Sequence, residues 1–344
     1  MPAPFFIIGT PRSGTTLLSV MLENHSEVYV DGESVGISLA REFGYFKRVL
    51  SQNPTKSKEQ LLARICAQSY KGRLANLIPE EIIAQSIDVR TLLSESVNQF
   101  AAVAGKKMWG DKTPELIFHI PAILELFPNA RFIQMVRDGH SNAASLHQRQ
   151  YYPLDLAAQY WKEINGLGLA YQYILGPNQF LLLRYEELLQ DPSAAMRKVC
   201  KFLSIPFESE ILDLSKASST KGDGAYVAKT IDSNRIDSWK KKLSAADILR
   251  IEKICGDLLN ALDYELLQLG DPAKAKSLSY RKQFWLRQKM LFQMLGRKKR
   301  TQMIDRRLVK TNIPFKVRLR NFIFGTFSQV FSGDFIRLFK SDYR

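Results

Sequence analysis

The stretch FFIIGTPRSGTTL, residues 5–17, constrains the fold more than any other part of the sequence. A short apolar run that suits a buried strand meets Gly9, and a helical pattern begins after Gly14. A strand, a glycine-bounded turn and a helix start form an anion site, because the unpaired N–H groups of the first helical turn and the helix dipole both face it. The stretch therefore predicts a phosphate-binding loop at the edge of an α/β sheet.

This loop departs in one position from the pattern that binds nucleoside triphosphates, G-x4-G-K-[ST]. Thr15 follows Gly14, where that pattern has the lysine that reaches the β- and γ-phosphates. A fixed positive charge lies instead at Arg12, and Ser13 and Thr16 add hydroxyl groups. The missing lysine argues against nucleoside triphosphate chemistry. The structural alternative is a plain turn with a solvated arginine.

Several later apolar runs are each followed by a helical pattern: 106–110, 131–136 and 179–185. Strands that alternate with helices are typical of a parallel sheet covered by helices on both faces. We therefore expect a three-layer α/β fold of the P-loop NTPase type in a domain that spans residues 1–270. Residues 35–100 predict a helical cap inserted in this domain, and residues 215–238 predict a loop.

The basic charge of the chain is concentrated towards its carboxyl end. The formal net charge is +15, and residues 271–344 contain 19 Lys and Arg against 4 Asp and Glu. Segment 280–310 mixes this charge with Phe, Trp, Leu and Met. This mixture predicts a helical basic extension that either contacts a membrane surface or packs on the domain. Because no nucleic-acid-binding module accompanies the charge, we expect no nucleic-acid partner.

The remaining composition predicts the compartment and excludes a metal centre. The three cysteines are widely spaced, no apolar stretch approaches the roughly 20 residues of a membrane span, and the first expected strand begins at Phe5. We expect a cytoplasmic protein that is peripheral at the inner membrane face through its tail. The four histidines form no ligand or triad pattern, and we expect His140 and His147 to be peripheral.

The segment PRSGTTLL, residues 11–18, resembles the 5′-phosphosulfate loop of the sulfotransferases that use 3′-phosphoadenosine 5′-phosphosulfate (PAPS). The family transfers the sulfuryl group without a metal ion, which agrees with the missing lysine, and releases adenosine 3′,5′-bisphosphate (PAP). The resemblance implies that backbone N–H groups, the arginine and the paired threonines hold the 5′-phosphate end. The residues concerned are Arg12, Ser13, Gly14, Thr15, Thr16 and Leu17.

A second segment, VRDGHSNAASLHQR, residues 136–149, resembles the family's 3′-phosphate motif. Arg137 at a strand end and Ser145 two helical turns later can converge on one phosphate, and a guanidinium offers the bidentate fork that phosphate prefers. Arg149 lies one turn further along the same helix face, and an arginine there serves the cofactor in the tyrosylprotein branch. By the same resemblance Tyr185 reaches the adenine or a phosphate; otherwise it packs in the core.

Two residues are candidates for the chemistry, which needs a base for the acceptor proton and cations for the charge on the sulfuryl group. Glu33 lies 21 residues after Arg12, at the spacing of the general base in the tyrosylprotein and related bacterial branches. Lys112, in WGDKTPE, resembles the lysine that contacts the bridging oxygen and the transferring sulfuryl group. The alternatives are an exposed loop carboxylate and a surface lysine. Asp111 either orients Lys112 or caps the next helix, and we expect the cap.

The resemblance covers about residues 4–265 and implies sulfuryl transfer from PAPS to a hydroxyl group, or to an amine, of a small-molecule, lipid or glycan acceptor. A late basic loop with Arg235, Trp239 and Lys240 loosely resembles the loop that closes the family's cofactor site. Two other functions stay open. One is a P-loop kinase of a small alcohol or nucleoside, with Asp111 as its Mg²⁺ ligand. The other is a non-catalytic nucleotide-binding protein at a membrane surface.

Overall fold

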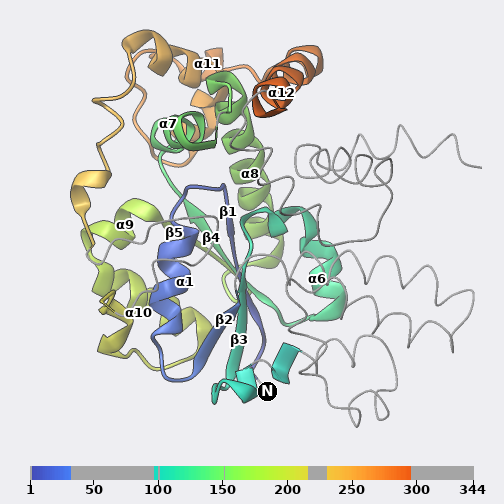
Figure 1. The fold of residues 1–344 in the computed structure, drawn as a ribbon, viewed down its shortest axis with the longest axis vertical. Coiled ribbons are helices and arrows are strands. Elements are labelled where there is room, and N and C mark those ends of the chain that lie inside the picture. Colours follow the sequence, from blue (N-terminus) through green and yellow to red (C-terminus); the bar gives the residue numbers. More distant parts are fainter. Residues whose placement is uncertain (1, 32–96, 100, 151, 216–230, 296–344) are drawn as a thin grey trace, which may run out of the picture. The chain divides into compact units, whose positions relative to one another are not determined.

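The computed structural model of the chain describes residues 2–31, 97–99, 101–150, 152–215 and 231–295 (Figure 1). Within these residues, five strands form one parallel sheet in the order β2-β3-β1-β4-β5. The strands are β1 (Phe5–Gly9), β2 (Val28–Asp31), β3 (Met108–Lys112), β4 (Arg131–Val136) and β5 (Phe180–Arg184). The expected cap at 35–100 lies almost entirely outside the described residues, as does most of the loop at 215–238.

The side chains of β1 alternate between the two faces of the sheet, as the period of two requires. Phe5 and Ile7 belong to a buried core with residues of α1 (Thr15–Glu23), α9 (Tyr185–Gln190) and α10 (Pro192–Leu203). On the other face, Phe6 stacks on Phe132 with ring centroids 5.5 Å apart and meets Trp109 edge-on at 5.6 Å. Alternate side chains of β1 therefore point into two core layers. We call the layer around Phe6, with Phe132 and Trp109, the aromatic layer.

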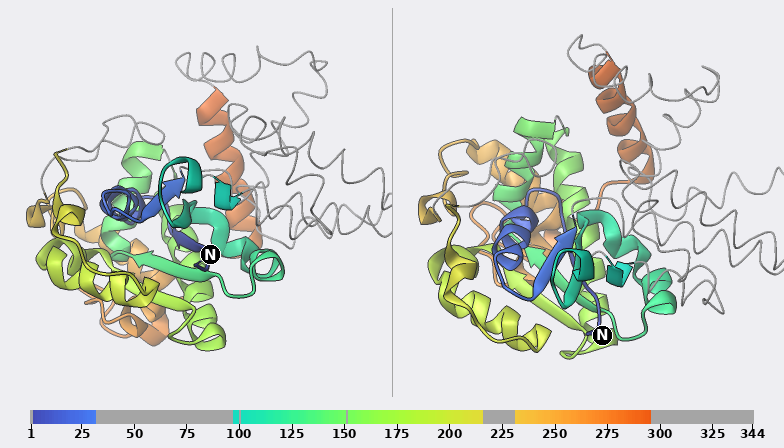
Figure 2. Two further views of the ribbon diagram at one scale, coloured as in Figure 1. Left: turned by 90° about the horizontal axis from the view of Figure 1, so that it is seen from below. Right: turned by 60° about the horizontal axis from the view of Figure 1, so that its bottom comes forward.

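Helices cover both faces of the sheet, as a parallel sheet requires (Figures 1 and 2). The segments η1 (Pro114–His119) and α6 (Ile120–Leu126) follow β3 and lead to Phe127, which contacts Phe6 on the aromatic face. On this face Asn165, in the second half of α8 (Leu154–Leu175), accepts a hydrogen bond from Gln134 at 3.0 Å. The expected three-layer α/β fold is confirmed.

Capping residues set the starts of two helices, α10 and α11. Asp191 accepts a hydrogen bond from the N–H of Ala194, and Pro192 takes the first position of α10. Ser244 likewise accepts from the N–H of Asp247 at the start of α11 (Ala245–Ala261). These short-range signals fix helix starts because both partners lie within one turn of the chain.

The chain divides into two compact units, residues 1–142 with 163–242, and residues 143–162 with 243–344. The first unit contains the sheet. The second contains α11, η4 (Pro272–Lys274), α12 (Tyr280–Leu295), the first part of α8 and the later part of α7 (Gly139–Gln150). In the second unit the fully buried Glu252 accepts hydrogen bonds from three consecutive N–H groups, those of residues 267–269. The division at residue 270 stays a prediction.

No helix in the described part of the chain combines the length with the apolar character that a membrane crossing needs. The longest, α8, has 22 residues but includes charged and amide side chains along its length.

Candidate functional site

The candidate site lies where the strands of the sheet end. Because all five strands are parallel, their carboxyl ends meet at one edge, and open α/β sheets bind ligands at this edge where the strand order reverses. Here the reversal is at β1, which has β3 and then β2 on one side and β4 and then β5 on the other. The loop that follows β1 therefore occupies the position where ligand binding is expected.

Two glycines give this loop its path. Gly9 has a φ of 143°, and a Cβ atom there would lie 2.4 Å from the carbonyl oxygen of Met135. Gly14 has a φ of 99°, and its Cβ atom would lie 2.4 Å from the ring of Tyr185. Both positions combine a backbone conformation that favours glycine with contacts that leave no room for a side chain. Arg12, between them, also has a positive φ of 77°.

Three main-chain carbonyl groups of the loop, those of Thr10, Pro11 and Arg12, accept hydrogen bonds from within the protein. Arg137 donates from Nη1 to the carbonyl oxygen of Arg12, and Asn142 donates from Nδ2 to that of Pro11, each at 3.1 Å. The N–H and the hydroxyl of Ser13 both donate to the carbonyl oxygen of Thr10, at 3.1 and 2.7 Å. The hydroxyl of Ser13, predicted to bind a cofactor, is thus part of the loop's own structure.

The start of α1 is open to an anion. Gly14 is the N-cap residue of α1, and no side chain caps the helix there. The N–H groups of the first helical turn, which include those of Thr15, Thr16 and Leu17, have no partner within the helix. These N–H groups and the positive end of the helix dipole lie where the sequence predicts an anion site.

Three segments that are remote in sequence meet at Arg137, the first residue after β4. Its guanidinium lies over the ring of Tyr185, 4.5 Å from the ring centre, and donates to the carbonyl oxygen of Arg235 at 3.5 Å as well as to that of Arg12. Tyr185 is buried and packs against Gly14. The structure thus brings together the predicted residues Arg12, Gly14, Arg137 and Tyr185, and adds the late basic loop.

The late loop is also held by a ring stack that the sequence does not reveal. Trp239 stacks on His140 with ring centres 4.6 Å apart and ring planes 10° from parallel. His140 is fully buried, and its Nδ1 lies 3.3 Å from the carboxylate of Asp138, which also accepts from the N–H of Ser141. The expectation that His140 is peripheral is therefore wrong. Its partner lies about 100 residues away in the sequence, so no local pattern could identify it.

Lys112 is the last residue of β3 and is 3% exposed, so it is not a surface lysine. It pairs in register with Ile7, which places both on the face of the sheet that α1 covers. Asp111 pairs with Phe6 and faces the aromatic layer. The expectation that Asp111 caps the next helix is wrong, because β3 continues through Asp111 and Thr113 is the N-cap residue of η1.

The structure describes the surroundings of the remaining predicted residues only in part. Glu33 lies outside the described residues, two positions after β2 ends at Asp31. Ser145, which is partly exposed, and Arg149 lie on α7 within the second unit. His147 is exposed, as predicted. Among the described residues, no group of three or more His, Cys, Asp or Glu side chains could hold a metal ion.

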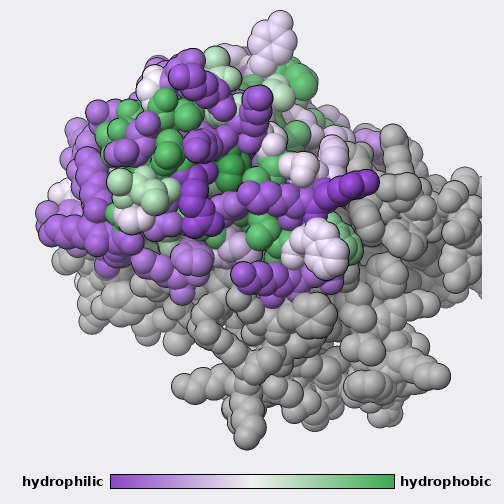
Figure 3. Space-filling view, turned by 90° about the horizontal axis from the view of Figure 1, so that it is seen from above, coloured by the Kyte–Doolittle hydropathy of each residue, from purple (hydrophilic) through white to green (hydrophobic). Residues whose placement is uncertain are grey.

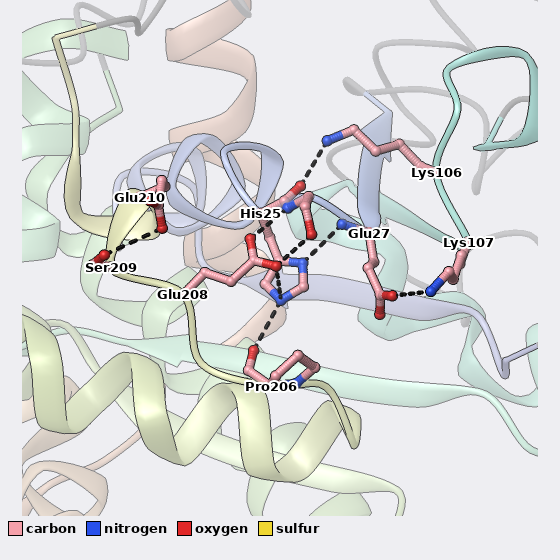
Figure 4. Close-up of polar contacts among 9 residues, drawn as sticks. His25, Glu27, Lys106, Lys107, Pro206, Glu208, Ser209 and Glu210 are labelled. Carbon is pink, nitrogen blue, oxygen red and sulfur yellow. Dashed lines mark hydrogen bonds and ion pairs between the residues drawn. The ribbon is translucent and has the colours of Figure 1, made fainter.

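A second polar cluster lies before the amino ends of β2 and β3, away from the loop edge (Figure 4). The buried His25 lies with Nε2 2.9 Å from the carbonyl oxygen of Pro206. Burial raises the pKa of Glu208, but hydrogen bonds from the hydroxyl and N–H of Ser26, with the nearby His25 and Lys106, outweigh burial and hold that pKa below its ordinary value. The cluster ties the end of α1 to the segment after α10.

Comparisons with known proteins identify the family of the chain and proteins that share its fold. A family model described as "Sulfotransferase family" matches residues 4–209. The nodulation protein NoeE of Sinorhizobium fredii (strain NBRC 101917 / NGR234) is 26% identical over 325 residues, which cover 83% of this chain and 73% of that protein. The protein-tyrosine sulfotransferase of Drosophila melanogaster is 24% identical over 283 residues, which cover 76% of this chain and 51% of that protein.

The chain also covers 33% of an uncharacterized protein of Aquifex aeolicus (strain VF5), with 24% identity over 284 residues. It thus spans only part of the length of these relatives. Among solved structures, the sulfotransferase domain from the curacin biosynthetic pathway matches 78% of this chain and 99% of its own length, with 23% identity and a TM-score of 0.50. This structural likeness shows a shared fold.

Proposed function

Because this chain belongs to the sulfotransferase family, we propose that it transfers the sulfuryl group of PAPS to a hydroxyl group and releases PAP. The observation that carries the proposal is the loop after β1. Its carbonyl groups at Thr10, Pro11 and Arg12 accept hydrogen bonds from within the protein, while the open start of α1 supplies N–H groups. A helix start with unpaired N–H groups suits a phosphate or sulfate group. The three carbonyl oxygens, which would repel an anion, are already hydrogen-bonded within the protein.

The two ends of the donor are assigned to two sets of residues. The 5′-phosphosulfate end is held by the loop and the first turn of α1, through Arg12, Ser13, Gly14, Thr15, Thr16 and Leu17. The 3′-phosphate is held by Arg137 with Ser145 and Arg149. Tyr185 supports the guanidinium of Arg137, which lies over its ring. The guanidinium of Arg137 donates to the carbonyl groups of Arg12 and Arg235, and neither of these bonds to a neutral group cancels its positive charge.

The transfer step needs one base and one cation. The acceptor oxygen forms a bond to sulfur, the bond between sulfur and the phosphate oxygen breaks, and the acceptor proton passes to the carboxylate of Glu33. Lys112 stabilises the charge that develops on the bridging oxygen. Its burial at the end of β3, on the face shared with α1, supports this role, because a cation in a poorly solvated site interacts more strongly with developing charge.

The acceptor class of this chain is part of the proposal. The fly relative is named a protein-tyrosine sulfotransferase, which describes that protein. For this chain we propose a small-molecule, lipid or glycan hydroxyl, in the cytoplasm. Among the described residues, Cys200 and Cys255 are buried and form no disulfide, which suits a reducing compartment.

The kinase alternative is less well supported than sulfuryl transfer. Its Mg²⁺ ligand would be Asp111, but the register of β3 points Asp111 to the aromatic face, whereas the loop leads into α1 on the opposite face. No lysine follows Gly14 to reach a γ-phosphate.

The decisive experiment is calorimetric titration of the purified chain with PAP and, separately, with ATP–Mg²⁺. We expect PAP to bind in the micromolar range or tighter and ATP–Mg²⁺ to bind weakly. The variant R137A should lower PAP affinity by about 10- to 100-fold, the cost of lost charge-assisted hydrogen bonds. The matched control is R197A, since Arg197 lies 4.0 Å over the ring of Phe207 in a similar stack away from the loop. Preference for ATP–Mg²⁺ would overturn the proposal in favour of a kinase.

A second experiment separates an enzyme from a binding module. In an assay with labelled PAPS and a panel of hydroxyl acceptors, E33Q should abolish label transfer while PAP affinity stays unchanged. If wild-type protein binds PAP tightly but E33Q and wild type transfer label equally, Glu33 is not the base. If PAP binds and no acceptor in the panel is labelled by wild-type protein, the non-catalytic reading is favoured.

A further inference from the structure

The helix α12, in the second unit, exposes three adjacent aromatic side chains. Tyr280 is 84% exposed, Trp285 70% and Phe284 40%, and the rings of Phe284 and Trp285 contact each other edge-on at 5.9 Å. Large aromatic side chains of a folded domain are normally buried, so an exposed group of three indicates contact with something else. The face seen from above, where α11 and α12 are drawn in Figure 1, mixes hydrophobic with strongly hydrophilic residues (Figure 3).

The opposite side of α12 is fixed to the second unit, so the aromatic side is presented in a defined orientation. Gln283 and Met290 are buried, and the amide of Gln283 donates to the carbonyl oxygen of Leu278 at 2.9 Å. Lys282 pairs with Asp155 of α8 at 2.9 Å. The aromatic side is therefore not simply the unpacked side of a loose helix.

The charge of α12 has one sign. Residues 280–295 contain two arginines and two lysines and no acidic residue. Arg281 and Lys289 are exposed and lie one helical turn before and after Trp285, so the three share one row of the helix surface. The sequence that follows, residues 296–344, adds 13 basic residues against 3 acidic ones. A partner for this surface must therefore be anionic and must also accept aromatic rings.

We propose that α12 binds an anionic lipid surface. Trp285, Phe284 and Tyr280 enter the interfacial layer, and Arg281 and Lys289 contact the lipid headgroups. Tryptophan and tyrosine favour this layer because each ring has an apolar body and a polar atom, and each basic residue near an anionic membrane adds about 1 kcal/mol to binding, or roughly five-fold. An acidic protein or a nucleic acid would use the same charge, but neither explains the three protruding rings as directly. The proposal does not depend on the sulfotransfer reaction.

Tryptophan fluorescence offers a specific test. The chain has four tryptophans, and Trp109, Trp161 and Trp239 are each at most 6% exposed. Trp285 alone can respond strongly to a new environment. We expect phosphatidylcholine vesicles containing about a third phosphatidylserine to shift the emission of the full chain to shorter wavelength and to protect it from iodide quenching. The variant W285F should remove this response.

Co-sedimentation with the same vesicles measures the contribution of the surface. The triple variant Y280A/F284A/W285A should weaken vesicle binding by at least about ten-fold, and R281Q/K289Q should weaken it by about 25-fold at low salt. The matched controls are Y173A, which removes an aromatic side chain that is 92% exposed on α8, and K253Q, which removes an exposed charge on α11. Both controls should bind as the wild type does.

Three outcomes would overturn the proposal. The first is equal binding to pure phosphatidylcholine vesicles, which would exclude an anionic surface. The second is vesicle binding that the α12 variants leave unchanged, which would assign it to residues 296–344 or to another surface. The third is absence of vesicle binding together with tight binding of an acidic polymer such as heparin, which would indicate an acidic macromolecular partner. Binding that falls in both sets of variants and in neither control supports it.

Discussion

The guanidinium of Arg137 donates a hydrogen bond to the main-chain carbonyl of Arg12, with Nη1 and the oxygen 3.1 Å apart. The residue proposed to bind the 3′-phosphate therefore also supports the loop proposed to bind the 5′-phosphate. One side chain links the two ends of the donor site, and its loss should affect both.

This link leads to a prediction for R137K. Lysine keeps the charge, but a single ammonium group cannot reproduce the planar fork that meets Arg12 and Arg235 and stacks on Tyr185. We expect the affinity for PAP to fall about ten-fold, and the affinity for AMP, which has no 3′-phosphate, to fall as well. Calorimetry with both ligands checks this. Unchanged AMP affinity would show that Arg137 acts on the 3′-phosphate alone.

Substitution of Gly14 by alanine should destabilise the protein and weaken PAP binding. A Cβ atom at Gly14 meets the ring of Tyr185 at 2.4 Å, in addition to the strain of a φ of 99°. The control is Gly105, whose φ is 68° and whose Cβ atom would meet nothing within 4 Å. We expect G105A to cost about 1 kcal/mol of unfolding free energy, the usual cost of a left-handed residue, and G14A to cost clearly more. Urea denaturation measures both, and equal costs would contradict the close contact.

Replacement of Lys112 by methionine should separate catalysis from binding. Methionine has a similar length and suits the buried end of β3, so the fold should be kept. We expect the rate of sulfuryl transfer to fall by about 10²–10³-fold, with a much smaller change in PAP affinity. The control K107M alters a lysine side chain that is 72% exposed and pairs with Glu27. If both variants lose activity equally, the proposed role of Lys112 is wrong.

The ion cluster around Glu208 should make stability depend on pH. The pKa of Glu208 is lowered in the folded protein from an ordinary value of 4.5, so its stabilising contribution is present above about 4.5 and is lost as the pH falls through the lower, folded value. The difference in unfolding free energy between wild type and E208Q should therefore be largest at neutral pH and shrink in acid. Denaturation series between pH 3 and 7 measure it.

The control for this pH series is E210Q, because Glu210 lies two residues away and is exposed, and its carboxylate accepts a hydrogen bond from the neighbouring Ser209. The difference between wild type and E210Q should change little over the same pH range. A difference between wild type and E208Q that grows as the pH falls would reverse the sign of the predicted effect.

The sequence predicts those parts of the site whose partners are close in the chain. The strand–turn–helix at residues 5–17, the arginine at the end of β4 and the tyrosine at the end of β5 are found where expected. The expected cap role of Asp111 is wrong, because the apolar run at 106–110 predicts a strand that ends before Asp111, whereas β3 continues to Lys112. The role of Lys112 in the transfer stays a prediction. The role of Glu33 stays a prediction.

What the sequence determined by itself is the layered α/β fold and the strand–turn–helix path of the loop at residues 5–17, since strand periodicity, glycine positions and helix starts act within a few residues. What only the tertiary structure decided is how the loop is held. The carbonyl of Arg12 meets Arg137 across 125 residues of chain, and His140 meets Trp239, which is also remote in the sequence. Such contacts follow from the order of the strands and the packing between layers, and neither leaves a local pattern in the sequence.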